Sequence, residues 1–403
     1  MSAGLFDLAL RVAARDLGGP VPRLVHNPAP RRDTRVAVSA HRVGRTVRVQ
    51  AVGLDGRLES GGGSAGLSAI ARAAGCATGD LGTGPTALVD SAATLRALAS
   101  LAQAHADPSR CAGLDVASGS SLVGWWVERA AHPGTSAVTD VLAVSRQRFM
   151  LGVVPGQDSP VLWRRVFHVP KGLAGLHTWH GAVTAGPELS GLGQVQEDDD
   201  WYLAAHQNAL AAQRSWDRPE TLHIAAARLA TRCDAADLYA AALLNDPLWR
   251  ARLVHTGHVC HGEAIIGAAT TSGRVVVRCP RLDTRLRAGS EVTGWPGDPM
   301  NAVPDARGRF TGEVIATSVI NGALTVTIGG LRRTGYLPAA GEVLTVIPAP
   351  PSVSTIRSRR SAIARLYKRR FSWLSQGVTP APVRRGVPLA VLIAAAEDID
   401  GER

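Results

Sequence analysis

The chain of 403 residues has few aromatic side chains, almost no lysine and no long apolar run. Aromatic residues make up 4% of it, and Lys171 and Lys368 are its only lysines. No stretch of about 18 apolar residues occurs, so the sequence predicts no transmembrane helix. With 45% hydrophobic and 19% charged residues, the composition also excludes a disordered or low-complexity chain.

Cysteine is scarce as well, with five residues in the whole chain. An odd number at irregular spacing disfavours the disulfide framework of a small secreted protein. Residues 1–16 mix apolar and charged side chains, so no signal peptide is predicted. We therefore expect a soluble, cytoplasmic protein without a membrane partner.

Arginine, by contrast, is abundant and gives the chain a formal net charge of +11. A GC-rich codon supply explains arginine that is scattered along the chain. It does not explain residues 357–370, which contribute +7 without an intervening acid. The basic residues of this cluster are Arg357, Arg359, Arg360, Arg365, Lys368, Arg369 and Arg370.

Apolar residues recur at helical spacing through the same segment, which predicts a basic amphipathic helix over residues 352–375. Seven like charges without partners repel one another, so we expect this helix to bind nucleic-acid phosphates. Two alternatives stay open. The helix could be a solvated element lying on the preceding domain, or it could contact a membrane surface, for which its apolar stripe is short.

The pattern of the chain divides it into five segments. Residues 1–32 form an N-terminal helix and linker, and residues 33–150 form an α/β domain. Residues 151–255 are a mainly helical connecting region, residues 256–348 a small β-barrel, and residues 349–403 the basic helix and tail. Within the α/β domain we expect the order βββαβαβα, with the last strand at 122–127 and the last helix at 135–148.

Short motifs within the α/β domain are typical of one family. They are TALVDS at 86–91, WVE at 126–128, HPG at 132–134 and TDVLA at 139–143. In their order and separation, residues 33–150 resemble the ribonuclease H family. The resemblance implies a mixed sheet with a strand ending in Asp-Ser before a helix.

The family's chemistry is two-metal hydrolysis, in which four acidic groups hold two Mg²⁺ or Mn²⁺ ions. The resemblance matches the third and fourth acids to Asp90 and Asp140, as metal ligands and catalytic residues. The first two acids would fall at residues 36–40 and 65–67, where the chain has VAVSA and AGL. His132 lies close to the position of a histidine that aids product release. The resemblance thus implies an incomplete acidic site.

Each of the two aspartates also has a purely structural interpretation. Asp90 could cap the helix that begins just after it. Asp140 could be a solvated acid in the first turns of the following helix. In either case the carboxylate needs no metal.

A second cluster of polar residues precedes the barrel. It contains His255, His258, Cys260 and His261, with Cys279 further along. Zinc binds such side chains, but the spacing matches no common finger or ribbon. Alternate residues of a strand face opposite sides, so a strand that enters the barrel is the better interpretation.

Residues 278–292, which include the sequence DTRLRAG, resemble the small β-barrel near the start of superfamily 1 helicases. This resemblance extends over residues 257–375 and implies a helicase-associated role. The sequence contains no G-x-x-x-x-G-K-[ST] loop for nucleotide phosphates, so an ATPase motor would be a separate subunit.

The sequence therefore predicts an α/β ribonuclease H-like domain, a helical segment, and a small β-barrel with a basic C-terminal helix. The leading hypothesis is a catalytically impaired protein that binds a nucleic-acid duplex or RNA–DNA hybrid. One alternative is a divalent-metal-dependent ribonuclease H-type nuclease. The other is a helicase-associated or scaffold subunit without its own motor.

Overall fold

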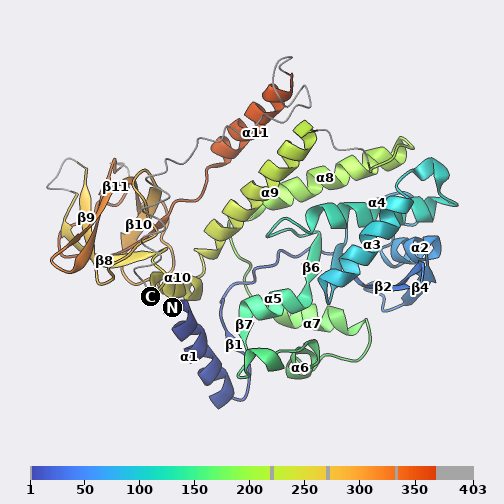
Figure 1. The fold of residues 1–403 in the computed structure, drawn as a ribbon, viewed down its shortest axis with the longest axis horizontal. Helices are drawn as coiled ribbons and strands as arrows, with labels where there is room; N and C mark the ends of the chain where they lie inside the picture. The colour runs from blue at the N-terminus through green and yellow to red at the C-terminus, as the bar shows by residue number, and fades with distance from the viewer. Residues whose placement is uncertain (1, 218–221, 269–272, 332–334, 369–403) are drawn as a thin grey trace, which may run out of the picture.

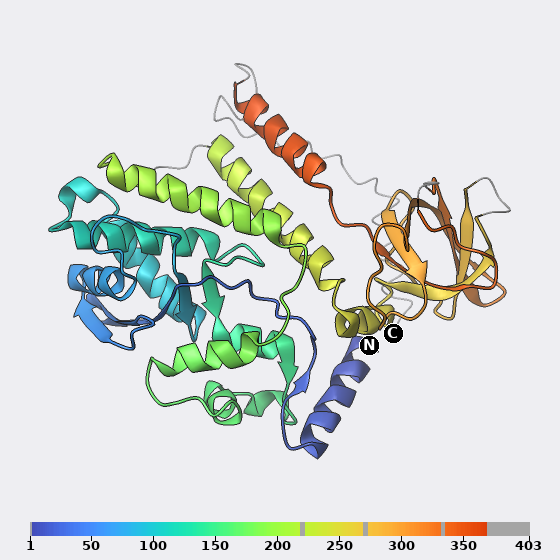
Figure 2. The same ribbon diagram turned by 180° about the vertical axis from the view of Figure 1, so that it is seen from behind.

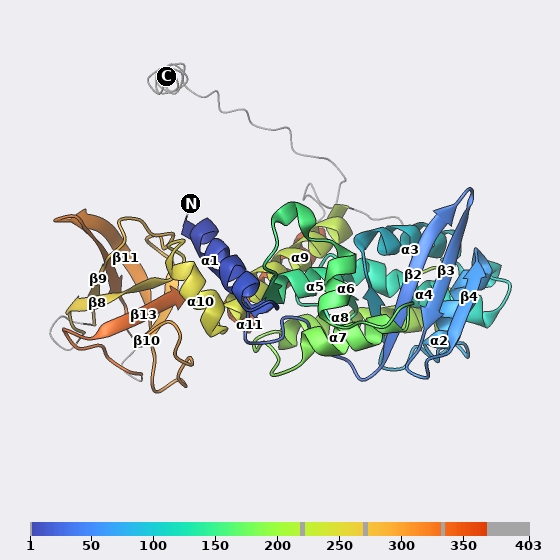
Figure 3. The ribbon, with the colours of Figure 1, turned by 90° about the horizontal axis from the view of Figure 1, so that it is seen from below.

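A computed structural model describes residues 2–217, 222–268, 273–331 and 335–368. The molecule is elongated, with an α/β unit at one end, a β-barrel at the other, and long helices between them (Figure 3). The expected mixed α/β class is confirmed. No helix in the described ranges combines the length and apolar character needed to cross a membrane.

The α/β unit is built on a five-stranded mixed sheet in the order β4-β3-β2-β5-β6. Its first three strands form an antiparallel meander, and the last two run parallel to β2. The strands are β2 (Arg35–Val43), β3 (Thr46–Val52), β4 (Leu58–Gly62), β5 (Thr86–Val89) and β6 (Val138–Asp140).

Helices cover both faces of this sheet (Figure 1). Along β2 the side chains alternate between the faces, because Val36 and Val38 belong to one apolar cluster and Ala37 to the other. The first face packs against α2 (Ser64–Ala73), α3 (Ala92–Ala104), α4 (Leu114–Arg129) and α8 (Gly193–Ala211). The second packs against α5 (Val141–Arg148), α6 (Pro160–Val166) and α7 (Gly175–Thr184).

The expected strand at 122–127 is wrong, because these residues lie inside helix α4. Their apolar run comes from a helix that is buried on nearly every side, and such a run has no visible period. The helix is rich in small residues that permit this close packing. At Gly119 a Cβ atom would lie 2.1 Å from the Leu67 carbonyl oxygen of α2.

The last strand of the sheet is instead β6, which takes the start of the helix expected at 135–148. Helix α5 begins only at Val141, because Asp140 caps it: its Oδ1 accepts a hydrogen bond from the Ala143 N–H at 2.9 Å. The domain therefore has the order βββαβααβα, with the two helices α3 and α4 between β5 and β6.

The N-terminal segment and the connecting region link the two ends of the molecule. Strand β1 (Val21–Pro22) pairs with β7 (Phe149–Met150), and α1 (Ser2–Asp16) lies beside α10. The connecting helices are α9 (Leu222–Leu243) and α10 (Pro247–Val254). Single 3-10 turns occupy Pro108–Arg110 and Pro155–Gln157.

Six antiparallel strands close into a barrel in the order β10-β11-β12-β9-β8-β13. They are β8 (Cys260–Ile266), β9 (Val275–Cys279), β10 (Glu291–Pro296), β11 (Phe310–Ile320), β12 (Ala323–Gly329) and β13 (Val343–Pro348). The buried Arg250 of α10 attaches the barrel, because its guanidinium donates to the Pro299 carbonyl at 2.9 Å and to the Leu244 carbonyl at 2.8 Å.

After β13 the chain returns to the centre of the molecule as α11 (Val353–Lys368), which lies along α9 (Figure 2). Its buried Ile356 packs against α8 and α9 through Val195, Ala235 and Leu238. The helix thus docks on the connecting helices rather than on the barrel. The expected end of this helix, residues 369–375, lies outside the described residues.

Close packing of α2 on α4 gives a stability prediction. Replacing Gly119 with alanine forces the two helices apart, and we expect the free energy of unfolding to fall by about 1–3 kcal/mol. Gly181 of α7 is the matched control, because no atom lies within 4 Å of a Cβ added there. Gly181→Ala should stabilise by about 0.5–1 kcal/mol. Urea unfolding measures both, and equal effects would contradict the packing argument.

Candidate functional site

The sheet brings Asp90 and Asp140 to neighbouring strand ends. Asp140 is the last residue of β6 and pairs in register with Val89, the last residue of β5, and Asp90 follows directly. Burial raises the pKa of the Asp140 carboxyl above its usual value, and the nearby Asp90 charge raises it further. Both side chains are half-buried. The two carboxylates therefore lie close enough for their charges to interact.

Their structural roles differ from those that the sequence suggested. The cap of α3 is Ser91 rather than Asp90, so Asp90 is not held there as a helix cap. Asp140 is itself the cap of α5 rather than a solvated acid within the helix. One oxygen of Asp140 is thus already used by the Ala143 N–H.

Neither segment where the resemblance places the other two acids, residues 36–40 and 65–67, contains a carboxylate. On β2, Ala37 is fully buried in an apolar cluster with Leu88. On α2, a Cβ at Gly66 would lie 2.8 Å from the Val49 side chain of β3. Glu59, the nearest acid along β4, is paired with Arg72 at 2.9 Å. In the parts of the chain that the structure describes, no group of three or more potential metal ligands occurs.

A site for two metal ions needs more carboxylates than Asp90 and Asp140 provide, so these residues do not fit the family's metal centre. His132 is also not placed to aid product release, as the resemblance implied for a nearby histidine. It is buried, and its Nε2 lies 3.5 Å from the Thr231 hydroxyl of α9. Burial, with the neighbouring Arg129 charge, lowers its pKa to about 4, so the ring is neutral near pH 7.

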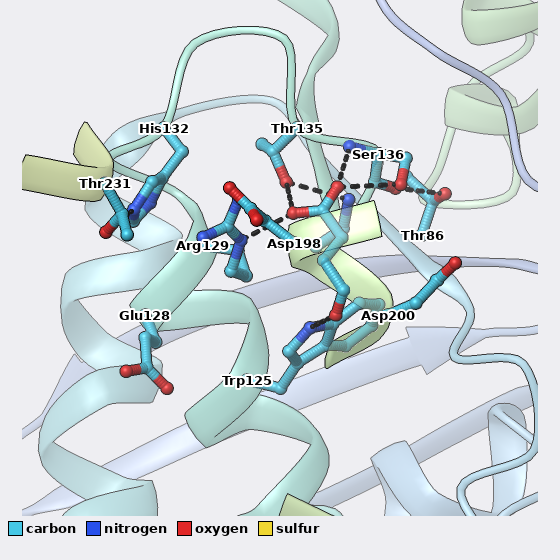
Figure 4. A network of polar contacts seen from close by, with 12 residues as sticks. Thr86, Trp125, Glu128, Arg129, His132, Thr135, Ser136, Asp198, Asp200 and Thr231 are labelled. Atoms are coloured by element: carbon cyan, nitrogen blue, oxygen red, sulfur yellow. Dashed lines mark hydrogen bonds and ion pairs between the residues drawn. The ribbon is translucent and has the colours of Figure 1, made fainter. Parts of the chain in front are cut away.

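A buried polar network was missed by the sequence analysis, and it lies where β5 and β6 begin, at the opposite ends of these strands from Asp90 and Asp140 (Figure 4). The carboxylate of Asp199, in α8, accepts from Arg129 Nε at 2.5 Å and from the Thr135 hydroxyl at 2.8 Å. It also accepts from the N–H and hydroxyl of Ser136, at 2.7 and 2.9 Å. The Trp125 indole N–H donates a hydrogen bond to the backbone carbonyl of Asp199 at 3.0 Å. Asp199 and Arg129 are both fully buried.

The acids on either side of Asp199 bind other parts of the chain. Asp198 accepts two hydrogen bonds from the Arg360 guanidinium of α11, at 2.8 and 2.9 Å. Asp200 pairs with Arg32 of the N-terminal linker at 2.5 Å. The only sequence signal for this junction was the acidic run at 197–200, which a solvated helix face would show equally well.

The described arginines of the basic cluster therefore fall into two groups, one paired with acids of the protein and one exposed. Arg360 also donates to Asp234 of α9 at 2.7 Å, and Arg359 pairs with the same buried carboxylate. These two arginines have partners within the protein, contrary to the expected run of unpartnered charges. Arg357 and Arg365 are exposed. The side chain of Lys368, and all of Arg369 and Arg370, lie outside what the structure describes.

A cavity of about 530 Å³ opens where α11 meets α8 and α9. Its walls include Trp201, Tyr202, Thr231, Arg360 and Ile363. The two aromatic rings meet edge to face, with centroids 4.8 Å apart, and Trp201 is 66% exposed. An exposed indole beside a basic helix is a surface on which a planar group can stack.

The histidines that precede the barrel do not form a metal site. His258 Nδ1 lies 2.8 Å from the Thr256 hydroxyl, and His261 Nδ1 lies 3.2 Å from the Leu344 carbonyl oxygen. Cys260 begins strand β8, as the strand interpretation predicts.

Comparisons with protein-family models, curated proteins and solved structures found no match.

The Asp199 network gives a prediction with a neighbouring control. Asp199→Asn keeps the size of the side chain but leaves the Arg129 charge buried without its counter-ion, and we expect a loss of about 3–5 kcal/mol. Asp200→Asn removes an ion pair whose acid is 65% exposed and should cost less than about 1 kcal/mol. Chemical unfolding compares them. Similar losses in both variants would mean that the buried pair is not the main support of this junction.

Proposed function

We propose that the protein binds nucleic acid through a ribonuclease H-like domain that is catalytically impaired. The observation that carries this proposal is the mixed sheet β4-β3-β2-β5-β6, with Asp90 and Asp140 at the ends of its parallel strands. It fits the mixed sheet and the aspartate positions that the family resemblance implies, with two helices, α3 and α4, between β5 and β6 where one was expected. The absence of an acid at 36–40 and at 65–67, where the resemblance places the first two, supports impairment, because two-ion hydrolysis depends on them.

The binding surface that we propose is the outward side of α11. Arg357 and Arg365 are eight residues apart, so their side chains project about 80° from each other around the helix axis, and both are exposed. The opposite side is docked through Ile356, Arg359 and Arg360. Exposed arginines suit phosphate oxygens, and such contacts hold a duplex or hybrid by its backbone and shape rather than its sequence.

The test is a double substitution on the outward side. Arg357→Gln with Arg365→Gln should weaken binding to duplex or RNA–DNA hybrid. It should also reduce the slope of log K against log salt by about 2, because two phosphate contacts are lost. Fluorescence anisotropy over a salt series measures both quantities.

The matched control is Arg57→Gln with Arg110→Gln, which removes the same charge from side chains that are 77% and 86% exposed elsewhere. It should leave the salt slope unchanged. The proposal fails if the wild-type protein binds no duplex, hybrid or single strand at low salt, or if the control weakens binding equally.

A divalent-metal-dependent nuclease is the second candidate, favoured by the closeness of Asp90 and Asp140. It predicts cleavage of a hybrid with Mg²⁺ or Mn²⁺ that is abolished in Asp90→Asn. Asp140→Asn is the companion variant, because the amide oxygen can still accept from Ala143 and cap α5. Gel analysis of a labelled hybrid measures this cleavage. A wild-type protein that is inactive with both metals would exclude this candidate.

A further inference from the structure

Two cysteines meet inside the barrel at the ends of neighbouring strands. Cys260 is the first residue of β8 and Cys279 is the last residue of β9. The antiparallel register, with Glu263 opposite Arg278, brings these two ends together. The two Sγ atoms lie 2.8 Å apart, and the residues are only 4% and 3% exposed.

Gly262 explains why the strands approach so closely at this point. A Cβ there would lie 2.1 Å from the Arg278 carbonyl oxygen and 3.0 Å from the Cys279 Cα. Any larger residue would push β9 away from β8. The glycine thus permits the backbone approach that places the sulfurs in contact.

We propose that Cys260 and Cys279 form a reversible disulfide bond, which makes the barrel a site of oxidation by hydroperoxides. A disulfide bond is about 2.05 Å long, so the sulfurs need to move together by less than about 1 Å. Oxidation would tie the two strand ends covalently. This inference does not depend on the proposed binding of nucleic acid.

The hydrogen bond between the thiols assigns each sulfur a role. It lowers the pKa of Cys279, although burial opposes this, and it raises the pKa of Cys260, which keeps its proton. The Cys279 thiolate attacks the peroxide, whose O–O bond breaks, leaving a sulfenic acid and one water or alcohol. The Cys260 sulfur then attacks Cys279 Sγ, the S–S bond forms, and water leaves. The two thiols lose the two electrons that the peroxide gains.

The bond would lie next to a basic segment of the barrel. Cys279 directly precedes residues 280–290, in which Arg285 and Arg287 line a groove of about 540 Å³ with Thr317 and Ser318. Fixing Cys279 to β8 would restrain the start of this segment.

Peptide mapping of the full-length protein tests the proposal. The folded protein is treated with hydrogen peroxide, remaining thiols are alkylated in denaturant, and the chain is cut with trypsin. Cleavage after arginine places Cys260 in residues 253–274 and Cys279 in residues 279–281. We expect these two peptides to be joined, with the loss of two hydrogen atoms, and to separate after treatment with dithiothreitol.

Cys260→Ser should abolish the joined peptide, whereas Cys233→Ser, at an exposed cysteine, should leave it intact. Separate alkylation of Cys260 and Cys279 after peroxide treatment of the folded wild type would overturn the proposal. So would a cross-link that appears only after denaturation, or one that pairs either residue with another cysteine. The wild-type result decides the question even if Cys260→Ser fails to fold.

Discussion

Three consecutive aspartates on α8 hold the centre of the molecule together. Successive residues of a helix point about 100° apart, so neighbouring acids reach different parts of the protein. Asp198 binds Arg360 of α11, Asp199 binds Arg129 of α4, and Asp200 binds Arg32 of the linker. One turn of helix thereby positions the basic helix, the α/β unit and the N-terminal segment. The middle contact dominates because it is fully buried and also holds Thr135 and Ser136.

The same contacts determine which charges of α11 are left for a partner. Asp198 and Asp234 neutralise Arg360 and Arg359 on the docked side, so Arg357 and Arg365 are the described basic residues of α11 that stay on the outward side. A helix with seven unpaired charges would repel itself and would have no fixed orientation. Pairing two of them orients the helix and keeps Arg357 and Arg365 facing solvent.

Local patterns predicted much of the secondary structure. Strand β5 and helix α3 flank Asp90 and Ser91 of the TALVDS motif as the resemblance implies, because a short apolar run ends at this polar pair before helical spacing begins. Helix α4 was misread for the opposite reason, since its surroundings bury it almost completely. The pairing of Asp199 with Arg129 joins residues 70 positions apart, and no local pattern encodes that distance. Asp90 was placed correctly, directly after a predicted strand, whereas the strand that ends at Asp140 was predicted as the start of a helix, because its three residues are too few to show a period of two.

The packing around β2 and α2 disfavours the two further carboxylates that the family resemblance implies. Gly66 is pressed against Val49, so an acid on α2 would force that helix away from β3. Ala37 is buried beside Leu88, so an acid there would lose its hydration without gaining a donor. Restoring four carboxylates would therefore disrupt the packing of the sheet on both faces. The sheet is specified by its apolar faces, whereas chemistry on any such sheet depends on a few residues at the strand ends, so the fold alone does not establish an activity. What the sheet then contributes is a rigid support that holds α8, and through it the exposed side of α11, in place.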